Sequence, residues 1–174
     1  MTAKWTGSVV VAAGAAVLIL GVTMAARSQS HASRGPQPAA WTQAVKAVDD
    51  AVSRHDLGTA TWAAAAAYRT ALASPGWEGI VEAGDAYLRV GEADGLRRDA
   101  EAQARRAYLT ALFRARRQRS LDGVLRVAET FADLGDREVT AHCLHVADGL
   151  ARSSGDPDAS ARVTATRTRL AARL

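Results

Sequence analysis

Three side chains of types that bind metal ions lie close together near the C-terminus. They are His142, Cys143 and His145 in the stretch AHCLH. Residues three apart share one face of a helix, so the two histidines could reach a single ion. The sequence offers no evident fourth ligand, and Cys143 or Leu144 lies where the expected helix needs a core residue. We therefore expect neither a metal site nor another cofactor.

Pairs of carboxylates, which general acid–base catalysis uses, occur at Asp49 with Asp50 and at Glu78 with Glu82. Carboxylates in such pairs are equally typical of the solvated face of an amphipathic helix. The sequence contains no G-x-S-x-G motif, no H-E-x-x-H motif and no glycine-rich phosphate-binding loop. We therefore expect a protein that is not an enzyme.

The chain is basic and contains very little cysteine. It has 174 residues, a formal net charge of +4 and one cysteine. A single cysteine excludes an intrachain disulfide and any zinc site built from several cysteines. Net positive charge alone is a weak indication of nucleic-acid binding. The residues after position 26 suffice for one domain with a modest core.

An uncharged run of 22 residues, 5–26, follows a short N-terminal flank at 1–4. A helix of this length spans about 33 Å, and the hydrocarbon core of a bilayer measures about 30 Å. We therefore expect a single-pass transmembrane anchor. A cleavable signal peptide is the alternative, although the apolar part of such peptides usually has only about 7 to 15 residues.

The charges on the two sides of this segment give almost no bias by the positive-inside rule. Export signals also begin with a short basic N-terminus, so we expect the domain outside the cytoplasm, held at the cell membrane. Gly7, Gly14 and Gly21 recur every seven residues and would permit a homodimer through helix pairing. An Ala- and Gly-rich span also produces such spacing without any dimer.

The rest of the chain predicts an all-α protein. Residues 27–40 are polar and contain Pro36 and Pro38, which indicates a flexible linker. Apolar residues then recur at three- and four-residue spacings, and no segment alternates with period two. The pattern predicts helices over 41–56, 59–74, 77–91, 96–119, 121–134, 137–153 and 157–174.

Two pairs of segments in this helical region resemble each other. Residues 67–73 read AYRTALA and 107–113 read AYLTALF, while 79–92 and 123–136 agree in residue type at most positions. The repeated unit is a helix pair in which a small residue lets the partner helix approach and an aromatic side chain fills the space above. Such pairs bury little alone and stabilise one another by stacking, which predicts an α-solenoid.

These repeats resemble the tetratricopeptide repeat family. The matching residues are a small residue three before an aromatic one, a closing glycine, and small-large-small triads in the second helix: Gly84 or Ala128, Tyr87 or Phe131, Gly91 or Gly135, Ala64, Tyr68 and Ala71, and Ala104, Tyr108 and Ala111. The resemblance covers residues 41–153 and leaves 154–174 as a capping helix. Residues around 92–103 are additional to the family pattern, and the first helix lacks the small and aromatic signature.

The resemblance implies that the first helix of each pair lines a concave groove. The acidic residues expected in this groove are Asp49, Asp56, Glu78, Asp85, Asp122 and Glu129. Residues 77–92, for example, contain four acidic residues and one basic residue. Such a groove would favour a cationic segment of a protein or peptide partner. Alternatively, these carboxylates only keep the surface solvated.

Residues 96–119 contain eight arginines and two acidic residues. The densest basic patch within them comprises Arg105, Arg106, Arg114, Arg116, Arg117 and Arg119. It could bind an anionic membrane surface or nucleic acid, or it could be a solvated helix face. Nucleic acid is disfavoured because Tyr108 and Phe113 are expected to pack inside the domain instead of stacking on bases.

The sequence therefore predicts a membrane-tethered adaptor or scaffold that binds another protein through a tetratricopeptide-like solenoid. In layout it resembles the single-pass tetratricopeptide-like proteins found beside bacterial secretion and envelope-assembly machines. Binding of anionic lipid or nucleic acid through residues 96–119 is the alternative function.

Overall fold

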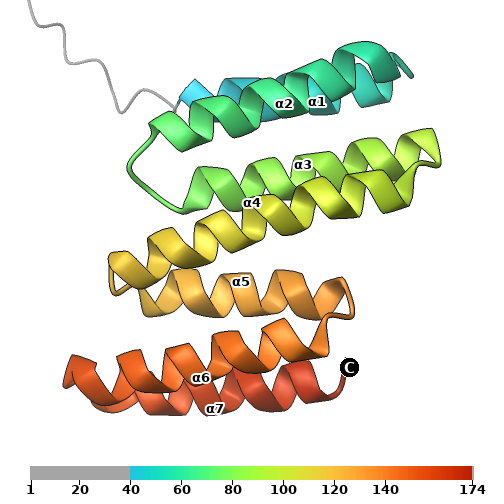
Figure 1. The fold of residues 1–174 in the computed structure, drawn as a ribbon. Coiled ribbons are helices and arrows are strands. Elements are labelled where there is room, and N and C mark those ends of the chain that lie inside the picture. The colour runs from blue at the N-terminus through green and yellow to red at the C-terminus, as the bar shows by residue number, and fades with distance from the viewer. Residues whose placement is uncertain (1–39, 174) are drawn as a thin grey trace, which may run out of the picture. The chain divides into compact units, whose positions relative to one another are not determined.

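The computed structural model describes residues 40–173, which form seven α-helices and no strand (Figure 1). The helices are α1 (Ala40–Ser53), α2 (Leu57–Ala73), α3 (Glu78–Asp94), α4 (Arg97–Arg117), α5 (Leu121–Asp133), α6 (Arg137–Ser154) and α7 (Pro157–Ala171). The all-α prediction is confirmed for this region. The predicted anchor at 5–26, with Gly7, Gly14 and Gly21, lies outside the described residues. Within residues 40–173, no helix combines the length and the apolar character that a membrane span requires.

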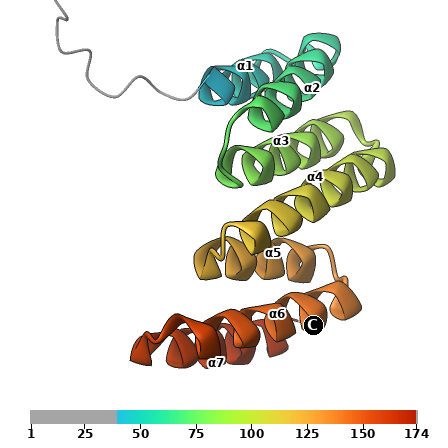
Figure 2. The same cartoon turned by 60° about the vertical axis from the view of Figure 1, so that its left-hand side comes forward.

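The helices are stacked in chain order, from α1 and α2 at one end to α6 and α7 at the other (Figures 1 and 2). Each helix packs against the next, and further contacts join α1 to α3 and α5 to α7. Stacking of successive helix pairs in this way is the arrangement of an α-solenoid. The fold thus fits the predicted solenoid, and the type of repeat stays a prediction.

The helix boundaries follow local capping chemistry. Side chains of Asp56, Ser120, Asp136 and Asp156 accept hydrogen bonds from backbone N–H groups in the first turns of α2, α5, α6 and α7. The predicted end of α3 at Gly91 is wrong, because the helix continues to Asp94 and ends at Gly95, which has a φ of +68°. The additional residues around 92–103 therefore lengthen α3 and α4.

Glycines in α3 and α5 allow aromatic side chains to lie directly on the helix backbone. A Cβ atom on Gly79 would lie 2.7 Å from the indole ring of Trp41, and one on Gly123 would lie 2.7 Å from the ring of Trp77. Gly84 receives the ring of Tyr108 in the same way. Gly79 and Gly123, which correspond in the sequence repeat, therefore each lie against a tryptophan ring. At Gly84 the predicted role of a small residue is confirmed.

The repeated tyrosines also occupy matching positions. Tyr68 of AYRTALA packs against Tyr87 with ring centroids 6.4 Å apart, and Tyr108 of AYLTALF packs edge-on against Phe131 at 5.9 Å. Both pairs join the second helix of one unit to a neighbouring first helix. The sequence repeat is therefore a repeat of packing, and it positions the polar side chains described next.

Candidate functional site

Four of the six predicted groove carboxylates are bonded to arginines of a neighbouring first helix. We call the surface of α1, α3, α5 and α7 the first-helix face. On it, Asp49 pairs with Arg89 at 2.8 Å, and Asp85 pairs with Arg126 at 3.0 Å. Two further pairs join Asp122 to Arg162 and Glu129 to Arg169. The partners are 40 or 41 residues apart in the sequence. These inter-repeat ion pairs leave the first-helix face less acidic than the sequence suggests.

The two remaining predicted groove residues lie at helix starts. Asp56 is the N-cap of α2, and its carboxylate accepts a hydrogen bond from the Thr59 backbone N–H at 3.1 Å. Hydrogen bonding by Thr59 lowers the pKa of Asp56. Glu78 is exposed in the first turn of α3 and forms no ion pair with any residue of 40–173. The binding role assigned to these six residues stays a prediction.

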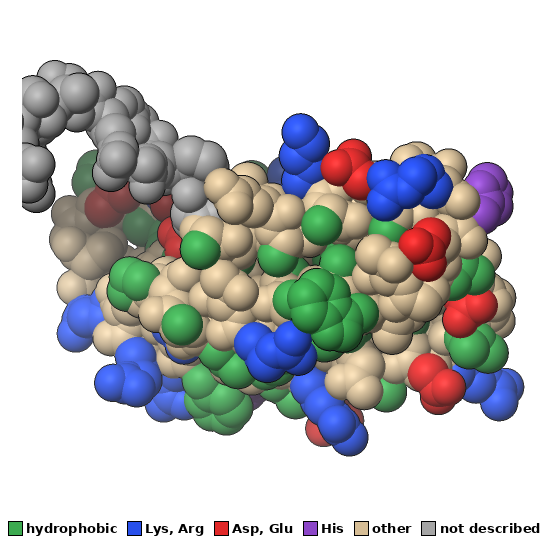
Figure 3. All heavy atoms as spheres, turned by 90° about the horizontal axis from the view of Figure 1, so that it is seen from above, with side chains coloured by type: hydrophobic (Ala, Val, Ile, Leu, Met, Phe, Trp, Pro, Cys, Tyr) green, Lys and Arg blue, Asp and Glu red, His purple; other side chains and the backbone are tan. Residues whose placement is uncertain are grey.

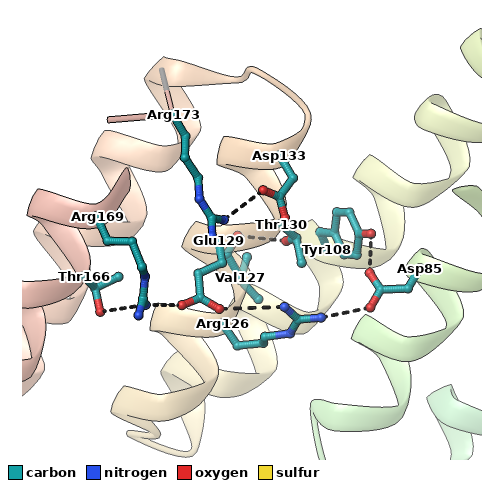
Figure 4. Close-up of polar contacts among 10 residues, drawn as sticks. All are labelled: Asp85, Tyr108, Arg126, Val127, Glu129, Thr130, Asp133, Thr166, Arg169 and Arg173. Atoms are coloured by element: carbon teal, nitrogen blue, oxygen red, sulfur yellow. Dashed lines mark hydrogen bonds and ion pairs between the residues drawn. The ribbon is translucent and has the colours of Figure 1, made fainter. Parts of the chain in front are cut away.

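A polar network crosses from α4 through α3 and α5 to α7 (Figure 4). The Tyr108 hydroxyl donates to Asp85 at 2.6 Å, and Arg126 reaches both Asp85 at 3.0 Å and Glu129 at 3.7 Å. Arg169 then binds the other oxygen of Glu129. Burial and the charge of Asp85 raise the pKa of Tyr108, so its hydroxyl stays protonated and donates. The network connects α3 and α4 to α5 and α7. It also engages Asp85 and Glu129, two of the carboxylates predicted to bind a partner.

The AHCLH stretch lies on α6 with its cysteine inward and its histidines outward. Cys143 is fully buried, whereas His142 and His145 are exposed. Among residues 40–173, no group of three or more His, Cys, Asp or Glu side chains could hold a metal ion. The prediction that Cys143 or Leu144 is a core residue is confirmed, since both are buried.

Burial, with a smaller effect of Asp136, raises the pKa of the Cys143 thiol to about 12. We expect Cys143 to react with a thiol reagent at least about a thousandfold more slowly in the folded chain than in denaturant, because only opening of the core exposes it. A chain carrying Cys143→Ala and Ser160→Cys, whose cysteine lies on the exposed face of α7, should react at once. Comparable rates for the two chains would contradict a closed core.

The pKa of Cys143 also predicts a pH dependence. Its contribution to stability is complete below the ordinary thiol pKa of 9.0 and is lost as the pH rises towards about 12. The free energy of unfolding, measured by urea denaturation, should therefore fall less steeply above pH 9 in the Cys143→Ala variant than in the unaltered chain.

Half of the predicted basic patch has structural partners. Arg114 donates to the carbonyl groups that end α2 and form the following turn, namely those of Ala71 at 3.2 Å, Leu72 at 3.1 Å, Gly76 at 3.0 Å, and Ser74. Arg105 pairs with Glu101 at 3.3 Å and Asp136 at 3.8 Å. Arg119 donates to Ser153 at 3.0 Å. Arg106, Arg116 and Arg117 are exposed and form no ion pair within residues 40–173.

This division predicts different effects of two neighbouring substitutions. Arg114→Ala should lower the free energy of unfolding by about 2 kcal/mol, because it removes charged hydrogen bonds from the carbonyl groups at the end of α2. Arg117→Ala should change it by less than about 0.5 kcal/mol. Urea denaturation followed by circular dichroism compares them, and equal effects would contradict the structural role of Arg114.

A groove between α4 and α6 is the most apolar opening beside the remaining arginines. It encloses about 280 Å³ and is lined by Leu109, Leu112, Phe113, Arg116, Glu138, Val139, His142 and Val146. We call it the α4–α6 groove. Phe113 is 64% exposed and Leu109 is 40% exposed. The prediction that Phe113 packs inside the domain is therefore wrong, whereas Tyr108 is buried as predicted.

A second groove lies where α2, α3 and α4 meet, and it encloses about 350 Å³. Its lining includes Tyr87, Val90 and Leu96 together with Asp94 and Asp99. On α2, Trp62 is 69% exposed. Figure 3, a view onto the α1–α2 end of the stack, shows hydrophobic side chains exposed among charged ones. Among residues 40–173, the exposed large hydrophobic side chains belong to α2, to α4 or to Leu96 directly before α4.

Comparison with protein-family models and with curated proteins gives no match for this chain.

Proposed function

We propose that this chain is a membrane-tethered adaptor that binds a partner protein through its helical stack. The observation that carries the proposal is the exposure of Phe113 and Leu109 beside the α4–α6 groove. Exposed apolar side chains next to a groove are typical of protein interaction sites. The uncharged run at 5–26 is the proposed tether, and the domain would lie outside the cytoplasm.

The tetratricopeptide-like character of the stack is part of this proposal. It is supported by the contact of Gly84 with Tyr108 and by the matching aromatic pairs of Tyr68 and Tyr108. The first-helix face is the less suitable binding site, because Asp85 and Glu129 already bind arginines of this chain. A partner at that face would have to compete with these ion pairs.

Binding to an anionic membrane surface is the second candidate. It is supported by Arg106, Arg116 and Arg117, which are exposed near Phe113 and lack an ion pair within residues 40–173. Arginines next to apolar side chains are typical of surfaces that lie on anionic lipid. Nucleic acid is less well supported, because one exposed phenylalanine offers little surface for base stacking.

Photo-crosslinking in native membranes tests the proposal on the full-length chain. A photoreactive phenylalanine analogue at position 113 should form a crosslink to a discrete protein, since Phe113 is 64% exposed beside the groove. The same analogue at Thr164, an exposed position of α7, should not. Crosslinks to lipid alone would favour the second candidate, and equal protein crosslinks at both positions would contradict a specific site.

A further inference from the structure

The exposed face of α4 has the spacing of a helix-pairing surface. Arg106, Leu109, Phe113 and Arg116 follow one another at intervals of three, four and three residues, and all four are exposed. Side chains at these intervals lie in one line along a helix. The two arginines are therefore about 15 Å apart along the axis, with the two apolar side chains between them.

The opposite wall of the α4–α6 groove is formed by α6. Val139 and Val146 are half-buried there, and both line the groove together with Leu109 and Phe113. The opening of about 280 Å³ accommodates apolar side chains of a ligand. A helix laid along α4 would insert side chains one turn apart into it, as in other helix-in-groove complexes.

The charges around the groove determine which helix fits. Residues 105–119 contain six arginines and no acidic residue. Arg106 and Arg116 have no acidic partner within residues 40–173, so they can pair with a ligand. Glu138 is the one acidic residue in the groove lining, and it lies on the α6 side. A ligand helix must therefore be acidic along its contact with α4.

We propose that the α4–α6 groove binds an amphipathic helix of the partner protein. That helix presents two apolar side chains one turn apart, with an acidic side chain about one turn beyond each. The inference rests on the proposed adaptor function and reverses the charge of the partner predicted from the sequence. A membrane surface fits the groove less well, because it would bring anionic headgroups towards Glu138 and leave the apolar lining between α4 and α6 unfilled.

A displayed library of helical peptides tests this proposal. The full-length chain, held in nanodiscs of neutral lipid, selects peptides whose surface positions are randomised. The selected peptides should carry Asp or Glu beyond both ends of an apolar pair, because these acids reach Arg106 and Arg116. A twin peptide with lysine at the acidic positions should bind at least about tenfold more weakly in fluorescence anisotropy, since it loses both ion pairs and its lysines are repelled by Arg106 and Arg116.

Two variants of the chain locate the binding. Phe113→Asp should weaken binding of the selected peptide at least about tenfold, because it places a charge among apolar contacts. Thr164→Asp on the exposed face of α7 should leave binding unchanged. Melting of both variants should equal that of the unaltered chain, since both side chains are exposed.

Several results would overturn the proposal. These are failure to enrich any peptide, enrichment without acidic residues, and equal binding to the Phe113→Asp variant. Phe113-dependent binding to phosphatidylglycerol vesicles that no peptide displaces would assign the groove to lipid. If position 113 crosslinks to a protein while the selected peptides lack acids, the helix chemistry is wrong and the adaptor function stands. If position 113 forms no crosslink to a protein and the selected peptides lack acidic residues, both the adaptor function and the binding of an acidic helix are rejected.

Discussion

Substitution of Gly84 by valine should lower the free energy of unfolding by about 3 kcal/mol. A Cβ atom at Gly84 would collide with the ring of Tyr108. That ring cannot withdraw, because its hydroxyl binds Asp85 at 2.6 Å and its edge packs against Phe131 with centroids 5.9 Å apart. The cost therefore falls on the contact between α3 and α4, which positions the arginine-rich face.

Gly149 provides a matched control for this prediction. It also lies inside a helix, α6, but a Cβ atom there would meet nothing within 4 Å. Gly149→Ala should raise the free energy of unfolding by about 0.5 to 1 kcal/mol, because alanine restricts the unfolded chain more than glycine does. Urea denaturation of the full-length chain in detergent, followed by circular dichroism, compares both. A destabilising Gly149→Ala, or a neutral Gly84→Val, would contradict the packing described here.

Helix positions were predictable because hydrophobic periodicity and breakers act locally. The glycines show where this reasoning fails. Gly91 and Gly135 match in the sequence, yet Gly135 follows α5 with a φ of +72° while Gly91 lies inside α3 against Ala100. A glycine permits both a left-handed turn and a close helix contact, and only the tertiary structure decides between them.

The repeat relates the exposed Phe113 to a position of the preceding helix pair. In the self-match of 67–73 with 107–113, Phe113 corresponds to Ala73, the last residue of α2, and both positions are exposed. The aromatic character of Phe113 suggested packing, whereas its register matches it to Ala73, whose exposure only the structure shows. Register alone does not determine burial either, because the matching residues Leu72 and Leu112 are 39% and 5% exposed.

The charge on the first-helix face was not predictable by counting charges within each helix. Such counts miss pairing between helices. Three arginines of the C-terminal segment pair with acids of the predicted groove or of α5: Arg162, Arg169 and Arg173. The sequence did contain the signal, because acid and arginine are separated by 40 residues in each of these pairs. This separation is close to one structural repeat, so the pairing follows from the stacking.

Reversal of Asp85 and Glu129 to lysine should lower the free energy of unfolding by about 3 kcal/mol. Asp85→Lys removes the acceptor of the buried Tyr108 hydroxyl and brings a cation to Arg126. Glu129→Lys brings another cation between Arg126 and Arg169. The carboxylates are only 23% and 25% exposed, so solvent screens the new repulsion incompletely.

Glu78→Lys is the control for this double reversal, because Glu78 is exposed and has no ion pair within residues 40–173. It should change stability by less than about 0.5 kcal/mol in urea denaturation. Exchanging the charges of a pair without a third partner, as Asp49→Arg with Arg89→Asp, should recover part of the loss caused by Asp49→Arg alone, since opposite charges again face each other. If the double reversal were as stable as Glu78→Lys, the inter-repeat ion pairs would contribute nothing, and these acids would be free for a cationic partner. A large loss with partial recovery would mean that the first-helix face holds the stack together, and that partner binding belongs on the second helices.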